Sequence, residues 1–432
     1  MEKKMGLIDL VFMGMGGCIG AGIFSMLGVG IGLTGRSVAL AFIIAMIFKM
    51  TQQVRMIIMA SMFSLSGGMY SQNALILTPR LTGVSALTTL VSSFSFSVFG
   101  ISLASYLSLL VPALAPYEKI VACAMLLLFF LIASTGVNIF AKVQNLLGIS
   151  KIVALGLFIV FGLMVANHGG FEGEPYFING GISFVTAIAL MSFTCDGISN
   201  IVNMAQVTEN PKKNIPKAFI LASIACALIY AALGYVGSSI APYAEVANQN
   251  LGYLAQLVLP PALYIFFVIG GAMASLSTAL LGGITGFAPL IAGIAQDGWI
   301  PAPMKKLKNV YIVMAIGAIL PVIGGFSLDN IVAMIMVPAM VLGIITNLRA
   351  MKLPEQYAKE WASTGLNITP AFYRFMMWVS IVASALTGYF SLASLTLPLA
   401  IGTVVATVFI YVYAGWCLKA GKVDITSTTD LG

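Results

Sequence analysis

Charged residues are scarce in this sequence. They make up 8% of its 432 positions, whereas soluble domains usually carry about 25%. Apolar residues make up 60% of the chain. This balance excludes water as the main solvent of the protein and predicts a chain that lies largely within a membrane.

Signatures of catalysis and of metal binding are missing as well. The sequence has a single histidine, His168. It contains no phosphate loop, no nucleotide-binding glycine fingerprint and no HExxH pair. The cysteines lie in apolar runs without the spacing of a zinc site or a disulfide framework; they are Cys18, Cys123, Cys195, Cys226 and Cys417. We therefore expect five free thiols, no enzyme activity, no metal and no cofactor.

Long apolar runs fill most of the chain. A transmembrane helix needs roughly 20 apolar residues, and hydropathy predicts about twelve such helices here. The expected fold is therefore an all-α polytopic membrane protein. The predicted spans are 7–33, 37–62, 84–112, 119–138, 146–167, 182–204, 216–240, 261–294, 310–326, 329–348, 371–392 and 396–418. The first apolar run is too long for a signal peptide, so we expect it to be retained.

Positive charge is unevenly distributed between the predicted loops. With the N-terminus in the cytoplasm, most Lys and Arg residues fall on the cytoplasmic side, and Arg36 and Lys119 are the two in external loops. The positive-inside rule then predicts a multi-pass protein of the plasma membrane with both termini in the cytoplasm. The net charge of +7 therefore reflects the cytoplasmic loops and not a surface that binds nucleic acid. We expect the lipid bilayer as a partner and no nucleic acid.

Glycine and polar residues interrupt two of the predicted spans. Span 1 is dense in glycine over residues 14–22, and each glycine costs a helix about 1 kcal/mol relative to alanine. Span 6 carries Asp196 and Gly197 among hydroxyl side chains. Close helix packing is one interpretation, because Gly16 and Gly20 have the spacing for it. The other is an unwound segment in mid-membrane, whose free N–H and carbonyl groups bind a zwitterion.

The two interruptions are five spans apart. Interruptions in corresponding positions of two halves indicate an inverted repeat with a transport site between the halves. We predict a single transport domain over residues 1–432, with repeats over 7–167 and 182–348 and two additional helices over 371–418. The two halves show no residue-level identity.

Four stretches carry a more specific resemblance. They are GAGIF at 20–24, SGGMY at 66–70, ENPKKNIPK at 209–217 and QDGWIP at 296–301. In this order and spacing they resemble the amino acid-polyamine-organocation transporter superfamily, which has the leucine-transporter type of fold. The resemblance covers residues 6–420.

The resemblance implies a substrate site where discontinuous helices 1 and 6 meet. The backbone N–H groups expected to hold a substrate carboxylate are those of Gly20, Ala21 and Gly22. The carbonyls expected to hold its ammonium are those of Cys18, Ile19, Phe193, Thr194 and Asp196. Phe193 is also the expected gate. Cys195 lies in the same segment and should meet Cys18 across one central cavity.

A lysine in span 5 is implied to act in coupling. The stretch 142–151 resembles the family's start of span 5, and Lys151 matches a lysine that replaces a sodium ion in sodium-independent members. Snorkelling of its side chain toward the headgroups is the alternative. In span 8, Ser275, Ser277 and Thr278 are candidate partners for the amine, and we assign Ser277 and Thr278 to coupling. Such hydroxyls also commonly bond their own backbone.

Span 2 departs from the family pattern. Ile58, and Val207 after span 6, stand where the family often has glutamate, and span 2 instead carries Lys49 and Arg55. Intramembrane charges usually pair or face water. These cations therefore indicate either a second ionisable site, a partner for a carboxylate such as Asp196, or an error in the register of span 2.

Together these features predict a secondary active transporter that works by alternating access. We expect a sodium-independent exchanger or a proton-coupled symporter of amino acids. Asp196 would suit a cationic side chain, but acidic residues also occur at this break in carriers of neutral amino acids, and we favour a neutral substrate. The alternatives are a polyamine or cationic amino acid transporter and, from another class, a channel or membrane sensor.

Overall fold

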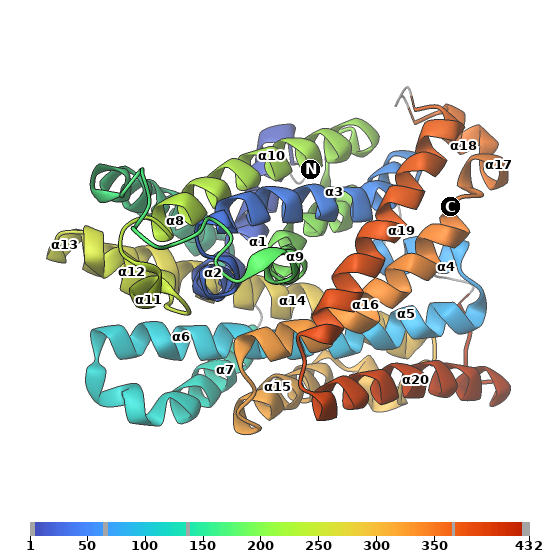
Figure 1. Cartoon of the computed structure of the whole chain (residues 1–432). Helices are drawn as coiled ribbons and strands as arrows, with labels where there is room; N and C mark the ends of the chain where they lie inside the picture. Colours follow the sequence, from blue (N-terminus) through green and yellow to red (C-terminus); the bar gives the residue numbers. More distant parts are fainter. Residues whose placement is uncertain (1–4, 64–67, 135–138, 365–367, 426–432) are drawn as a thin grey trace.

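The computed structural model describes residues 5–63, 68–134, 139–364 and 368–425 (Figure 1). This part of the chain is helical, with one isolated parallel bridge between Met5 and Thr208. The prediction of an all-α polytopic membrane protein is confirmed. A helix suits hydrocarbon because it satisfies the backbone polar groups along its own length.

Each predicted span has a helical counterpart. In chain order these are α1 (Leu7–Cys18) with α2 (Ala21–Thr34), α3 (Val38–Met62), α5 (Pro79–Ser92) with α6 (Phe96–Leu110), α7 (Glu118–Ser134), α8 (Ile139–Val165), α9 (Gly180–Met191) with the 3-10 helix Ser192–Val207, α10 (Pro211–Gly237), α13 (Pro261–Phe266) with the π-helical Phe267–Met273 and α14 (Ala274–Gln296), α15 (Leu307–Ile323), α16 (Leu328–Ala350), α19 (Pro370–Ala393) and α20 (Leu397–Lys419).

Short helices occupy the connections. They are α4 (Gly68–Ile76), α11 (Tyr243–Val246), α12 (Leu251–Val258), α17 (Leu353–Gln356) and α18 (Ala358–Ala362). Among the described residues, nine helical stretches are long and apolar enough to cross a membrane, and three shorter apolar helices add to them. The inverted repeat stays a prediction.

Proline begins several of the spans. It stands in the first turn of α5, α10, α13 and α19, as Pro79, Pro211, Pro261 and Pro370. A helix leaves its first N–H groups without an internal partner, so proline loses nothing at this place. The sequence thereby sets where these helices start.

The connections divide between two ends of the molecule. The short helices α17 and α18 lie at one end of the bundle, and α11 and α12 lie at the other (Figure 1). The Glu209 N–H donates to the Met5 carbonyl at 2.9 Å, and the Asp424 N–H donates to the Asp297 carbonyl at 3.0 Å. Both described chain ends thus contact connections that the sequence predicts on the cytoplasmic side.

The interrupted spans lie together. α1 packs against α10 and against the 3-10 helix of span 6, and α3 runs along α10. Figure 1 shows α1, α3, α9 and α10 as neighbours, with α8 beside them. The fold therefore brings both interruptions and the lysine of span 5 into one region.

Candidate functional site

Span 1 is broken where the sequence predicts it. α1 ends at Cys18 and α2 begins at Ala21. Between them Ile19 has φ −74° and ψ 80°, close to an inverse γ-turn, and the Gly20 N–H donates to the Cys18 carbonyl at 2.8 Å. The turn leaves other carbonyls at the end of α1 without helical partners. One of the three N–H groups expected to bind a carboxylate, that of Gly20, is already bonded here.

Lys151 of α8 reaches this break. Its Nζ donates to the Gly16 carbonyl at 2.9 Å and to the Ile19 carbonyl at 3.2 Å. The residue is only 5% exposed, so its side chain does not snorkel toward the headgroups. Hydrogen bonds from a charged donor are stronger than neutral ones. The ammonium group thus occupies carbonyl oxygens that the break sets free.

Span 8 adds a hydroxyl to the same break. Ser275 Oγ donates to the Ile19 carbonyl at 2.7 Å. Thr278 Oγ1 instead donates to the Ser275 carbonyl of its own helix at 3.0 Å, and within the described residues Ser277 makes no hydrogen bond to the break. Of the three span-8 hydroxyls, that of Ser275 therefore contacts the break, and the coupling role of Ser277 and Thr278 stays a prediction. Ser275 lies in the first turn of α14, directly after the π-helical segment Phe267–Met273.

Span 6 changes its helix type at the second interruption. α9 ends at Met191, and a 3-10 helix continues over Ser192–Val207, although such runs rarely exceed about four residues. A 3-10 helix pairs each carbonyl with the N–H three residues further on. The carbonyls of Phe193, Thr194 and Asp196 therefore lie in a hydrogen-bonded helix, whereas we expected them to be free. The interruption is a tighter helix rather than an unwound segment.

The two interrupted segments pack directly on each other. A Cβ added to Gly197 would lie 2.1 Å from the Gly17 carbonyl oxygen, and one added to Gly22 would lie 2.6 Å from Thr194 Cα. A residue with a side chain does not fit at either place without displacing backbone. The span-1 glycines thus flank a break and also allow close packing, and the binding of a zwitterion there stays a prediction.

A tyrosine that the sequence analysis missed joins the two segments. Tyr230 of α10 donates its hydroxyl to the Cys18 carbonyl at 2.7 Å, and the same hydroxyl lies 3.2 Å from the Thr194 carbonyl. The side chain is fully buried, and its ring packs on Phe42 with centroids 5.4 Å apart. Span 7 has no interruption, so nothing in its sequence distinguishes Tyr230 from a core residue.

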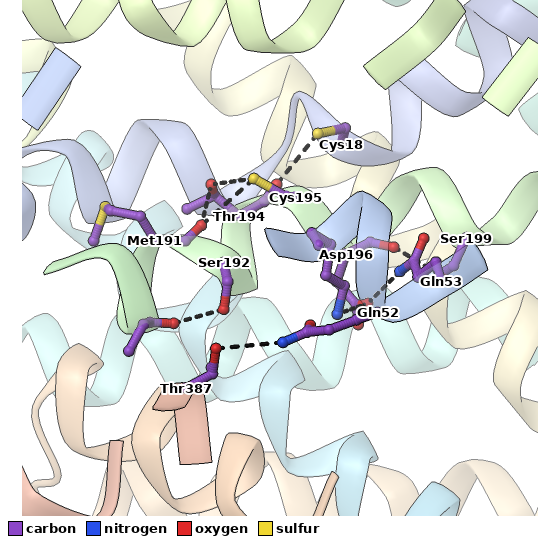
Figure 2. A network of polar contacts seen from close by, with 12 residues as sticks. Cys18, Gln52, Gln53, Met191, Ser192, Thr194, Cys195, Asp196, Ser199 and Thr387 are labelled. Carbon is purple, nitrogen blue, oxygen red and sulfur yellow. Dashed lines mark hydrogen bonds and ion pairs between the residues drawn. The ribbon is translucent and has the colours of Figure 1, made fainter. Parts of the chain in front are cut away.

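Asp196 forms an ion pair with span 2. Lys49 Nζ lies 2.5 Å from Asp196 Oδ1, and Gln53 Nε2 donates to the same oxygen at 3.3 Å. Figure 2 shows Gln53 directed at Asp196, and Gln52 directed at Thr387. The Lys49 side chain is 8% exposed and that of Asp196 is 49% exposed. The pairing given as one alternative for Lys49 and Asp196 is present, and α3 is continuous through Lys49 and Gln53.

The remaining predicted residues lie close by. Cys18 Sγ donates to the Thr194 carbonyl at 3.3 Å, and Cys195 Sγ donates to the Met191 carbonyl at 3.6 Å (Figure 2). Cys18 is 2% exposed and Cys195 is fully buried, so in this conformation the two thiols face packed protein. Phe193 is partly buried against the same core.

Arg55, the other cation of span 2, stands apart from this site. It is 6% exposed, and its Nη1 donates to Met59 Sδ at 3.7 Å. Nothing among the described residues explains its charge.

Comparison with known proteins decides the family. The profile of the family described as amino acid permease matches residues 5–418, nearly the whole chain. This chain belongs to the amino acid permease family. The resemblance found in the sequence is confirmed, and the permease is a multi-pass membrane transporter of small amino-acid-type substrates rather than an enzyme.

Curated relatives of the permease differ in what their names say they carry. This permease is 24% identical over 335 residues to a branched-chain amino acid permease of Bacillus subtilis, and the matched segment covers 71% of this chain and 70% of that one. It is 25% identical over 329 residues to a methylthioribose transporter of the same organism, covering 71% and 70%. It is also 25% identical over 337 residues to a chloroplastic cationic amino acid transporter of Arabidopsis thaliana, covering 71% and 57%.

Two of the family-like stretches of the permease meet at its predicted cytoplasmic end. Tyr70 Oη donates to Asp297 Oδ2 at 2.7 Å, and Trp299 Nε1 donates to Tyr70 Oη at 2.9 Å. Burial and the hydrogen bond to Asp297 raise the pKa of Tyr70, so its phenol stays neutral. Residues 66 and 67 of the first stretch lie outside the described residues. This network links α4 to the end of span 8.

Proposed function

We propose that this permease is a secondary active transporter of neutral amino acids that works by alternating access and without sodium. The observation that carries the proposal is the ammonium of Lys151 on the Gly16 and Ile19 carbonyls. In transporters with broken helices, freed carbonyls and half-helix ends hold the coupling cation. A cation built into the chain cannot dissociate, so a sodium gradient would drive no step through these oxygens.

Two coupling modes fit a fixed amine. If Lys151 keeps its proton throughout the cycle, the carbonyls at the break always bind a positive charge. Transport is then an exchange, in which inward movement of one substrate is balanced by outward movement of another. If the amine releases its proton on one side, the break loses its cation and transport is coupled to protons. Both modes use the same residues.

The substrate preference follows from the charge of Asp196. Lys49 neutralises this carboxylate at 2.5 Å, and Gln53 donates to the same oxygen. A cationic side chain of a substrate would have to compete with a lysine that is already in place. A neutral side chain meets no such competitor, which supports neutral amino acids over arginine, lysine and polyamines.

The distribution of positive charge supports a plasma-membrane location with cytoplasmic termini. The contacts of both chain ends with the connections after spans 6 and 8 fit this orientation. We therefore include the orientation in the proposal.

Counterflow in proteoliposomes tests the proposal. Vesicles preloaded with an unlabelled neutral amino acid should take up the labelled form faster than empty vesicles, and replacing sodium by potassium should leave the rate unchanged. A channel would show no acceleration. A competition panel of the twenty amino acids and polyamines then identifies the substrate. Strict sodium dependence would overturn the coupling assignment, and strongest competition by arginine, lysine or polyamines would overturn the neutral preference.

A further inference from the structure

The carbonyls that the family resemblance assigns to a substrate ammonium have donors from within the chain. The Cys18 carbonyl accepts the Gly20 N–H at 2.8 Å and the Tyr230 hydroxyl at 2.7 Å, which uses both of its lone pairs. The Thr194 carbonyl lies in the 3-10 helix and is also within 3.2 Å of the Tyr230 hydroxyl. An incoming amine therefore has to replace a donor before it can bind either oxygen.

The donors at the Cys18 carbonyl differ in how they can leave. The Gly20 N–H belongs to the turn that forms the break, so its removal requires a rearrangement of the span-1 backbone. Tyr230 approaches from another span, and its hydroxyl is the tip of a side chain on α10. A change of its χ angles, or a small shift of α1 relative to α10, separates it from both carbonyls while the turn stays intact. The replaceable donor is the phenol.

We propose that the Tyr230 hydroxyl holds the place of the substrate amine. It ties the two interrupted segments together, and the amine displaces it when substrate binds. This inference rests on the proposed function and assigns Tyr230 as a specificity-determining residue. It also explains why a buried tyrosine spans carbonyls of two different segments instead of bonding within one.

Displacement of this kind selects for an amine by the number and charge of its donors. An ammonium group offers three N–H donors, whereas a phenol or an aliphatic hydroxyl offers one. Hydrogen bonds from a charged donor are roughly twice as strong as neutral ones. An amino acid therefore gains by replacing Tyr230, but the matching 2-hydroxy acid exchanges one neutral donor for another. The native permease should bind an amino acid and reject its 2-hydroxy analogue.

The test compares Tyr230→Phe with Tyr373→Phe in purified full-length protein. Tyr373 is a matched control, because it is buried and donates its hydroxyl to the Ala350 carbonyl at 3.1 Å in the packing of α19 against α16. The melting temperature of each variant is measured with and without the neutral amino acid identified by the competition panel. Dissociation constants for this amino acid and for its 2-hydroxy analogue are measured alongside.

Tyr230→Phe should melt lower than native protein without substrate and show a larger rise on adding it. Its dissociation constant should fall by on the order of fivefold, since the amine no longer displaces a hydrogen bond, and rejection of the 2-hydroxy analogue should weaken. Tyr373→Phe should lose the same stability with and without substrate, and its dissociation constant should not change.

The displacement role would be overturned if Tyr230→Phe lost the same stability with and without substrate and bound the amino acid no more tightly than the native protein. If that variant does not fold, the native protein still decides, because equal binding of the amino acid and its 2-hydroxy analogue contradicts the inference. A native protein that responds to no amino acid at all would instead overturn the proposed function.

Discussion

Replacing Asp196 with asparagine should destabilise the permease more than replacing Lys49 with methionine. The Lys49 side chain is 8% exposed, so Asp196→Asn leaves a buried ammonium without its counter-ion, at a cost of about 3–5 kcal/mol. The Asp196 side chain is 49% exposed, so in Lys49→Met the remaining carboxylate can be hydrated, and the loss should resemble that of an exposed pair, about 1 kcal/mol or less.

Apparent melting temperatures of the solubilised protein measure this difference. In soluble domains of 150–250 residues, 1 kcal/mol shifts the melting temperature by about 2–4 °C, and by less in longer chains, so Asp196→Asn should lose on the order of 5 °C. Lys49→Met should lose about 1 °C. The double variant should recover most of the loss, because no charge then remains unpaired. Equal losses in the two single variants, or additive losses in the double variant, would refute the reasoning.

Three further outcomes are expected. Lys151→Ala should abolish transport while expression persists, because two carbonyls at the break lose their cationic donor; transport by this variant at the native rate contradicts the coupling role. Gly22→Leu should lose substrate binding, since the new Cβ would lie 2.6 Å from backbone of the opposite segment, whereas the matched Gly156→Leu, which has open space around Cα, should bind normally. A small polar thiol reagent should label Cys18 or Cys195 only as the site opens, and saturating substrate should slow the labelling. A variant with both residues changed to serine should resist inhibition by the reagent. Labelling at the same rate at every substrate concentration would remove both thiols from the site.

The spans and the first break could be predicted from sequence because each has a strong local cause. The bilayer requires long apolar helices, and the glycine density of residues 14–22 weakens one of them. Lys151 could be found only through the resemblance, since a lysine near the start of a span is otherwise compatible with snorkelling. The pairing of Lys49 with Asp196 could be stated as one alternative, because unpaired charge in a membrane is unfavourable.

The features of the site that the sequence does not reveal come from interactions between distant segments. Ser275 donates to the break just after a π-helical segment in span 8, and the run of hydroxyl residues alone does not reveal which of them makes this contact. Tyr230 contacts residues 212 and 36 positions away, in a span with no unusual composition. Span 6 keeps tight helical bonding through its polar residues, which composition alone does not distinguish from an unwound segment.

The C-terminal end of the described chain offers a way to observe motion. Gly298 adopts φ +87°, and a Cβ there would lie 1.9 Å from the Lys422 carbonyl oxygen, while the Asp424 N–H is bonded to the Asp297 carbonyl. The segment after α20 therefore packs against the end of span 8, the helix whose Ser275 contacts the break in span 1. A fluorophore attached to this segment would move with that helix and turn the tail into a reporter of the transport cycle.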